Sequence, residues 1–238
     1  MKVSVIIPCY NHYHYLNDAI ESVLLQRYDD LEIIVVDDCS SIIPKEEPTL
    51  ARAVWGTLQR TDRSSIDEVK YIKHERNRGL AATRNTGMRA ATGELLLPLD
   101  ADDKIHPDCI TKMVQHYKRY ERDIISSHLI TFGQYERISK PNPPTPTWND
   151  LRMTNRINCC SLFSKSMWEE LNGYDELMRD GYEDWEFWLR AAKAGYKIYS
   201  IPEILFYYRK HPIGESMLDK AKMKRQETIL YMRRKGSI

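Results

Sequence analysis

The stretch that most constrains this chain is Glu94–Asp103, which reads Glu-Leu-Leu-Leu-Pro-Leu-Asp-Ala-Asp-Asp. A short apolar run that ends in turn residues is typical of a strand buried on both faces of a parallel sheet. Packing does not explain the carboxylates of Asp100, Asp102 and Asp103 that follow, because a buried unpaired charge is costly. We therefore expect them at the carboxyl end of a central strand, where open α/β sheets bind ligands.

Two carboxylates at positions i and i+2 can converge on one hard cation and leave room for water and a phosphate-bearing ligand. Asp102, together with Asp100, is thus a candidate ligand for Mn²⁺ or Mg²⁺. The competing interpretation is a solvated acidic turn before the helix expected at Pro107, because motifs as short as Asp-x-Asp occur by chance.

Two upstream segments have the same arrangement of a strand followed by a polar loop. Lys2–Ile7 and Leu31–Val36 are apolar strands, and the apolar residues between them recur at helical spacing. Asp37 and Asp38 follow the second strand, as the three acids follow the central one. The alternation of strands and helices along the chain predicts a Rossmann-like α/β fold, with a mixed, mostly parallel sheet flanked by helices.

Glycine and proline set several expected boundaries. Pro8 ends the first strand, and Gly93 caps the helix that precedes the central strand. Two short strands are expected at Tyr196–Ile201 and Leu205–Arg209. Four prolines between residues 140 and 147 predict a surface loop and a candidate boundary within the chain.

Composition narrows the class of protein. The 238 residues are 42% hydrophobic and 29% charged, which is typical of a soluble globular domain. A net charge of +1 argues against a nucleic-acid partner. The five cysteines include no Cys-x-x-Cys pair, so we expect free thiols rather than disulfides or a zinc site. Free thiols, the lack of a recognisable signal peptide and the lack of an apolar run of bilayer length together favour a cytoplasmic location.

The common phosphate-binding fingerprints are missing from this sequence. No Gly-x-Gly-x-x-Gly follows the first strand, and no Gly-x-x-x-x-Gly-Lys-Ser/Thr occurs. A diphosphate at the expected sheet edge therefore needs another source of positive charge, which a divalent metal at Asp102 would supply.

Five segments, taken in order, resemble the family 2 inverting glycosyltransferases with the GT-A fold. They are Val3–Asn11, Val35–Ser40, Asn77–Gly87, Leu99–Asp103 and Gly181–Trp185. The resemblance implies one GT-A domain at 1–211, with a nucleotide-sugar-binding half at 1–105 and an acceptor-binding half at 106–211. A basic helical tail at 212–238 follows. Residues 43–67 depart from the family pattern, in which a short turn is common at this point.

The resemblance also implies a donor site and a metal site. The residues it assigns to the nucleotide-sugar are Pro8, Tyr10, Asn11, Asp38, Arg84, Asp100 and Ala101. Tyr10 would lie against the base, Asp38 (with Asp37 as its competitor) would accept from uracil or ribose, and Arg84 would pair with the diphosphate. The metal would be held by Asp102, His211 and Asp100. Each residue also has a structural alternative. Tyr10 could be an ordinary loop tyrosine, Asp38 an acidic turn cap and Arg84 a solvated surface arginine. His211 could be structural or exposed, and Asp103 could cap the next turn.

Asp184, with Glu183 beside it, is the expected catalytic base. Inverting transfer is one in-line displacement, in which a carboxylate takes the acceptor proton opposite the leaving diphosphate. A helix start keeps these acids ionised, and aromatic neighbours exclude water. The competing interpretation is an acid pair at a helix N-terminus beside a tryptophan core. Trp185 and Trp188 could equally stack on a sugar or lie in that core.

The resulting hypothesis is metal-assisted transfer from a nucleotide-sugar, with a UDP-sugar expected, to a hydroxyl of a sugar or lipid-linked sugar acceptor. Such transfer serves polysaccharide or glycoconjugate synthesis. The absence of a Gln-x-x-Arg-Trp segment and of membrane spans favours a single transfer over polymerisation. The rival hypotheses are a non-catalytic nucleotide- or sugar-binding module and a sugar-phosphate nucleotidylyltransferase.

The tail from Asp219 onward is rich in lysine and arginine and predicts a basic amphipathic helix. Such a helix can lie on an anionic membrane, which would place the protein peripherally at the inner face. A solvated helix, or one that forms a homodimer, is the alternative.

Overall fold

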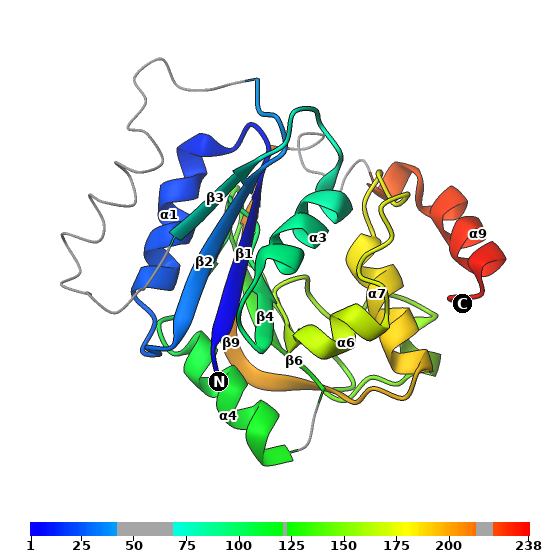
Figure 1. Cartoon of the computed structure of the whole chain (residues 1–238). Helices are drawn as coiled ribbons and strands as arrows, with labels where there is room; N and C mark the ends of the chain where they lie inside the picture. Colours follow the sequence, from blue (N-terminus) through cyan, green and yellow to red (C-terminus); the bar gives the residue numbers. More distant parts are fainter. Residues whose placement is uncertain (42–68, 121–122, 213–220) are drawn as a thin grey trace.

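The computed structural model describes residues 1–41, 69–120, 123–212 and 221–238. The segment 43–67, which departs from the family pattern, lies outside these residues. In the described part, one sheet of nine strands has the order β3-β2-β1-β4-β8-β6-β9-β5, with β7 paired to β6 (Figure 1). The strands are β1 Val3–Cys9, β2 Leu31–Asp37, β3 Val69–Lys73, β4 Leu95–Pro98, β5 Lys104–Ile105, β6 Ile124–Gly133, β7 Ile138–Ser139, β8 Leu162–Ser164 and β9 Ile198–Lys210.

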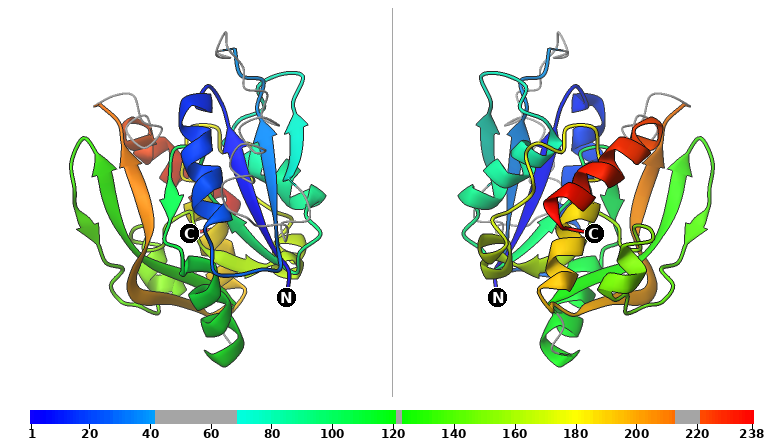
Figure 2. Two further views of the ribbon diagram at one scale, coloured as in Figure 1. Left: turned by 90° about the vertical axis from the view of Figure 1, so that its left-hand side faces the viewer. Right: turned by 90° about the vertical axis from the view of Figure 1, so that its right-hand side faces the viewer.

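Helices cover both faces of this sheet (Figure 1, Figure 2). The helices are α1 Tyr13–Leu24, α3 Leu80–Ala90, α4 Cys109–Tyr120, α5 Trp148–Leu151, α6 Lys165–Glu170, α7 Glu183–Lys193 and α9 Arg225–Lys235. Apolar residues of α1 and α4 form one core with alternate residues of β1 and β2. Residues of α3, α6 and α7 form a second core against the opposite face. The expected mixed sheet flanked by helices is therefore confirmed.

The first four strands of the sheet order are all parallel. β1 lies between β2 and β4, and β3 lies beyond β2. Every residue of β1, β2 and β4 is buried, which explains why these strands read as continuous apolar runs rather than alternating ones. Their carboxyl ends share one edge, so the loops after β1, β2 and β4 come together there.

The expected end of the first strand at Pro8 is wrong, because β1 continues to Cys9. The backbone N–H and C=O groups of the even-numbered residues in this strand point toward β4. Leu95 N donates to Lys2 O, and Leu99 N donates to Ile6 O. Pro8 also faces β4 and has no N–H to donate, so the pairing of β1 with β4 stops at Ile6 while its pairing with β2 continues.

Two other expected boundaries are also wrong. The predicted pair of short strands is one strand, β9, whose pairing with β6 shifts register around His128. Pro202 lies at that irregularity, where a proline is tolerated. Gly93 does not cap α3, since the cap is Ala91. A Cβ on Gly93 would lie 2.7 Å from Lys2 O, so glycine is needed there for close backbone approach.

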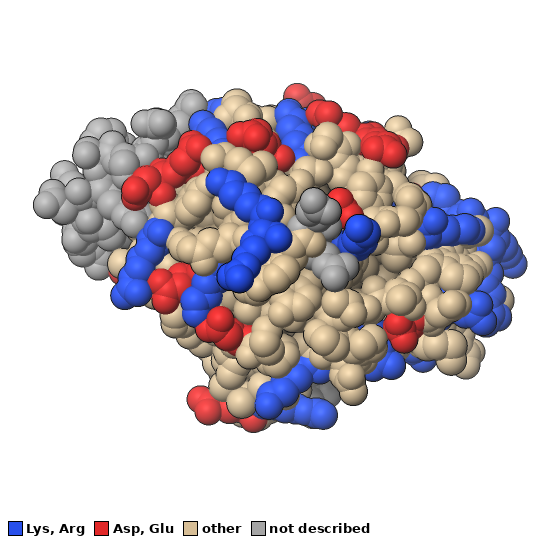
Figure 3. Space-filling model, turned by 90° about the horizontal axis from the view of Figure 1, so that it is seen from below, with Lys and Arg blue, Asp and Glu red and all other residues tan. Residues whose placement is uncertain are grey.

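The C-terminal tail packs on the domain through α9. Met232 is fully buried in the core that contains α7, and Ser237 Oγ donates to Glu186 Oε1 at 2.8 Å. Lysine and arginine side chains gather at the end of the molecule where α9 lies (Figure 3). Within the described ranges, no helix combines the length and apolar character needed to cross a membrane.

Candidate active site

Two adjoining pockets open at the carboxyl ends of the parallel strands. The smaller, of about 320 Å³, is lined by the loops that follow β1, β2 and β4. The larger, of about 640 Å³, is lined by β6, β7, the end of β9 and the start of α7. Leu80, Asp100 and Tyr208 line both pockets, so the two meet at these residues.

The smaller pocket brings together most of the residues expected at the donor and metal sites. They are Pro8, Tyr10, Asp38, Asp100, Ala101, Asp102 and His211. Asn11 is not among the lining residues. Its backbone N donates to Ser40 Oγ and its Oδ1 accepts from Ser41 N, both at 2.9 Å, so Asn11 joins the loops after β1 and β2.

Asp38 holds the turn that leads into α3. Its Oδ1 accepts from Arg78 N at 2.8 Å and lies 2.7 Å from His74 Nδ1, and its Oδ2 accepts from Gly79 N at 2.8 Å. A carboxylate offers about four acceptor positions, so Oδ2 can still accept from a ligand. Asp37, the competing acid, is fully buried and accepts from Tyr13 OH.

Asp102 and His211 form a close pair, with His211 Nε2 2.6 Å from Asp102 Oδ2. His12 Nδ1 lies 3.7 Å from the same oxygen. Desolvation alone would raise the pKa of Asp102, but the hydrogen bond from His211 and the charge of His12 bring the pKa below its usual value. An ionised carboxylate beside an imidazole is a donor set that suits Mn²⁺.

A second group of metal-ligating atoms is less suited to a hard cation. Asp100, Asp103 and Cys159 offer ligand atoms that lie within 4.8 Å of one another. Asp103 is fully buried and accepts from Arg209 N at 2.7 Å, so it ties this loop to β9 instead of capping the next turn. Burial raises the pKa of Asp103 and of the Cys159 thiol well above their usual values, which favours their protonated forms over metal-binding ones.

Arg84 lies beneath the junction of the two pockets rather than on the surface. Its side chain is 1% exposed, so the interpretation as a solvated arginine is wrong. Its Nη2 donates to Asp100 Oδ1 at 2.6 Å, and its Nη1 donates to Glu183 Oε1. One cation from α3 thus compensates two carboxylates, one after β4 and the other at the start of α7.

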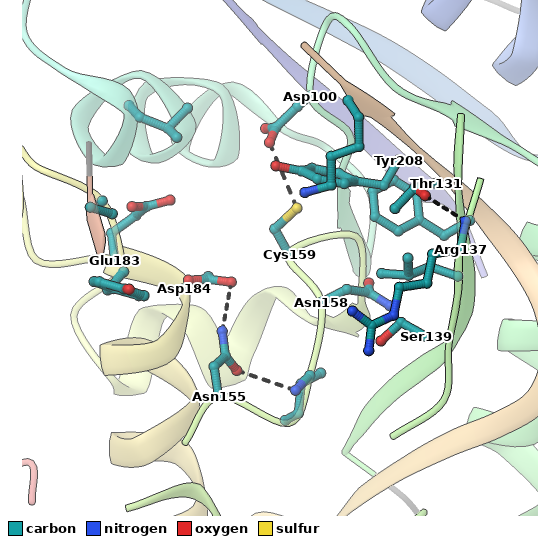
Figure 4. A pocket seen from close by; sticks show the side chains of 18 of the residues that line it. Asp100, Thr131, Arg137, Ser139, Asn155, Asn158, Cys159, Glu183, Asp184 and Tyr208 are labelled. Atoms are coloured by element: carbon teal, nitrogen blue, oxygen red, sulfur yellow. Dashed lines mark hydrogen bonds between the residues drawn. The ribbon is translucent and has the colours of Figure 1, made fainter. Parts of the chain in front are cut away.

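Asp184 faces the larger pocket from the first turn of α7 (Figure 4). Its Oδ2 accepts from Asn155 Nδ2 at 3.1 Å, and its Oδ1 accepts from Trp185 N at 2.7 Å. Burial, reinforced by the negative charge of Glu183, raises the pKa of Asp184 to about 7, so the expectation that the helix start keeps this acid ionised is wrong for Asp184. Trp185 and Trp188 lie in the core, so their interpretation as sugar-stacking residues is wrong.

Several site residues were not predicted from the sequence. Cys159 Sγ lies 3.7 Å from Asp100 Oδ2, and Asn155 bonds Asp184 (Figure 4). Both come from the irregular segment between α5 and β8, which has no periodic pattern. His12 and Tyr208 also line pockets. Their signal was available in part, since His12 directly follows Asn11 and Tyr208 lies three residues before His211.

Substituting Arg84 tests whether its function is to neutralise these acids. Arg84→Met leaves Glu183 buried without its cation, so we expect the free energy of unfolding to fall by about 3–5 kcal/mol. The double variant Arg84→Met/Glu183→Gln should recover part of this loss. Denaturant unfolding of both variants measures the effect. Unchanged stability together with weakened nucleotide binding would contradict this account and favour direct contact with the donor.

Family models match most of the chain. Residues 4–171 match the model described as glycosyl transferase family 2, and residues 148–212 match the N-terminal domain of galactosyltransferase. The uncharacterized glycosyltransferase YwdF of Bacillus subtilis is 26% identical over 96% of this chain and 82% of its own length. Glycosyltransferase GlyA of Streptococcus pneumoniae is 30% identical over 57% of this chain and 18% of its own length.

Solved structures share the fold. S. aureus TarS in complex with UDP-GlcNAc matches 98% of this chain with a TM-score of 0.72 and 21% identity. Mannosyltransferase PcManGT from Pyrobaculum calidifontis, in complex with GDP-Man and Mn²⁺, matches 99% with a TM-score of 0.66 and 19% identity. The chain spans 66% and 64% of these two structures. By its family match and its GT-A fold, the chain belongs to glycosyl transferase family 2 and is a glycosyltransferase.

Proposed function

We propose that this glycosyltransferase acts by inversion, with a UDP-sugar as donor and Asp184 as the general base. The observation that carries the proposal is a carboxylate with a pKa raised to about 7 in a pocket that adjoins the one lined by Asp102 and His211. A base with a pKa near the working pH suits proton transfer in the transition state. The structures of TarS with UDP and UDP-GlcNAc support the choice of nucleotide.

We assign the two pockets to the two halves that the family resemblance implies. We assign the smaller pocket to the nucleotide, because residues of the 1–105 half supply most of its lining. The larger pocket is assigned to the acceptor, because β6, β7 and α7 belong to the 106–211 half. The transferred sugar would lie where the pockets meet, at Asp100 and Tyr208.

Donor contacts follow from this placement. Tyr10 is 48% exposed and can stack on the base, beside the backbone of Pro8. Asp38 can accept from the base or ribose through its Oδ2, and Asp100 and Ala101 would contact the ribose and the sugar. Asn11 would act only by holding its loop. Arg84 would act by positioning Asp100 and Glu183 rather than by contacting the diphosphate.

The divalent metal, Mn²⁺ or Mg²⁺, would be held by Asp102 and His211, with Asp100 nearby. When bound, it supplies positive charge for the leaving diphosphate, which no phosphate-binding loop of this chain provides. PcManGT, which shares the fold, was solved with Mn²⁺.

The chemical step is a single displacement. An acceptor hydroxyl in the larger pocket gives its proton to Asp184 as its oxygen bonds to the anomeric carbon of the sugar. The bond from that carbon to the diphosphate oxygen breaks at the same time, and UDP leaves with the electron pair. Glu183 forms an ion pair with Arg84, so it would stay ionised beside Asp184 and would not take the proton itself.

Replacing the base tests this proposal directly. Asp184→Asn keeps the shape of the side chain but cannot accept the proton, so kcat should fall by about 10²–10⁴-fold with UDP binding retained. Sugar transfer to a panel of acceptors measures kcat, and calorimetry measures UDP binding. Asp180→Asn, an exposed acid three residues before Glu183, should keep wild-type activity. Full activity in Asp184→Asn would reject the assignment.

The pH dependence of kcat/KM provides a second test. The base works only when deprotonated, so kcat/KM should rise with pH through about 7 and then level off. The hydrogen bond from Asn155 lowers the pKa of Asp184, so Asn155→Ala should move this rise to higher pH. A profile that stays flat from about pH 5.5 to 8.5 would be inconsistent with Asp184 as the base.

Calorimetry of UDP binding tests the metal site. Wild type should bind UDP with Mn²⁺ and lose at least about tenfold in affinity in EDTA. Asp102→Ala should bind weakly under both conditions. Asp108→Ala, which removes an acid beyond the pocket, is the matched control. If the affinity for UDP stayed at the wild-type value both in EDTA and in Asp102→Ala, Asp102 would be ruled out as a metal ligand.

A further inference from the structure

The larger pocket has opposite charges on its two sides. Glu183 and Asp184 lie on one side, and Arg137 lies on the other (Figure 4). Lys140 and Lys210 also line the pocket, so three cations come from the β6–β7 hairpin, the residue after it, and the end of β9. None of these cations lines the smaller pocket, where the nucleotide is placed.

The hairpin that carries Arg137 is fixed by its own hydrogen bonds. Thr131 N donates to Arg137 O at 2.9 Å, and Arg137 N donates to Thr131 Oγ1 at 2.8 Å. Thr131 Oγ1 also donates to Tyr135 O at 2.9 Å, which closes the turn. Gln134 N reaches Lys210 O in β9 at 3.2 Å. The backbone of Arg137 is therefore held in place before any ligand arrives, which lowers the cost of binding.

The carboxylates that line the pocket already have ion-pair or hydrogen-bond partners within the protein. Asp100 and Glu183 share Arg84, and Asp184 accepts from Asn155 and from its own helix. Arg137 and Lys140 form no ion pair with any residue that the structure describes. Their positive charge therefore remains to be matched by whatever occupies the pocket.

We propose that the acceptor carries a phosphate group, bound by Arg137 and Lys140 while the acceptor hydroxyl reaches Asp184. This inference rests on the proposed function, which places the acceptor in this pocket. The planar guanidinium of Arg137 matches a phosphate with two parallel hydrogen bonds, and Lys140 adds a second charge. Asp184, whose carboxylate bonds an amide rather than a cation, repels the phosphate from the acid side when it is ionised, so the charges also orient the acceptor.

The remaining wall suits a polar molecule with an apolar face. Asn158 Nδ2 donates to Ser127 O, which fixes this side chain in the wall, and Ser139 supplies a hydroxyl that can bond a sugar. Tyr135 and Ile138 are 54% and 47% exposed on the same hairpin and can cover a sugar face or a lipid chain. The phosphate could belong to a phosphodiester polymer or to a lipid-linked sugar diphosphate, and these two sources are separated below.

The test measures the binding of four probes to the full chain by calorimetry, with and without UDP and Mn²⁺. Glycerol 3-phosphate represents a phosphodiester polymer and geranyl diphosphate a lipid-linked acceptor. Glycerol and geraniol are their uncharged counterparts. We expect at least one phosphate probe to bind about tenfold more tightly than its counterpart, as charge-assisted hydrogen bonds predict. The preferred probe identifies the source.

Two double variants make the test specific. Arg137→Ala/Lys140→Ala should lose the preference for phosphate and keep wild-type UDP binding, since both side chains are exposed and outside the nucleotide pocket. Lys118→Ala/Arg234→Ala removes the same charges from exposed positions on α4 and α9 and should behave as wild type.

Four results would count against one proposal or the other. Equal binding of charged and neutral probes, or a pocket variant that still prefers phosphate, would overturn the phosphate site. Loss of UDP binding in the pocket variant would overturn it too, because the cations would then serve the donor. A wild-type chain that binds a phosphate probe but not UDP would contradict the proposed donor and leave the phosphate site standing.

Discussion

The guanidinium of Arg84 joins the three parts of the chain from which the site is built. It rises from α3 and bonds the acid that follows β4 and the acid that begins α7. Asp100 lies where the two pockets meet, and Glu183 precedes Asp184. Because the cation is buried, its removal leaves unpaired charge between the layers, and the positions of both acids depend on it.

The same interaction separates the tasks of neighbouring acids. Glu183 is neutralised by Arg84, whereas Asp184 turns toward the larger pocket and bonds an amide instead of a cation. Its pKa is raised by burial, while the pKa of Asp102 is lowered by the two histidines around it. One acid can thus exchange a proton near neutral pH while another stays ionised for a metal.

The elements that could be predicted from the sequence are those with local signals. Apolar strands ending in polar loops indicated the parallel half of the sheet and the edge at which Asp38, Asp100 and Asp102 line one pocket, whereas Asp184 was expected only from the resemblance to the family. The partners of Arg84 could not be predicted, because they lie 16 and 99 residues away and meet it only in the folded chain. Asn155 lies in a segment without periodicity. The single strand β9 was missed because Pro202 suggested a break that a register shift accommodates.

The measurement that tests the account most directly is the anomeric configuration of the product. Proton NMR of the reaction mixture, before any mutarotation of hydrolysed sugar, gives the configuration from the coupling of the anomeric proton. A single displacement with Asp184 as base predicts a product whose configuration is opposite to that of the donor. A product that retains the donor configuration would contradict the account, because it requires two displacements or a different arrangement of donor and acceptor.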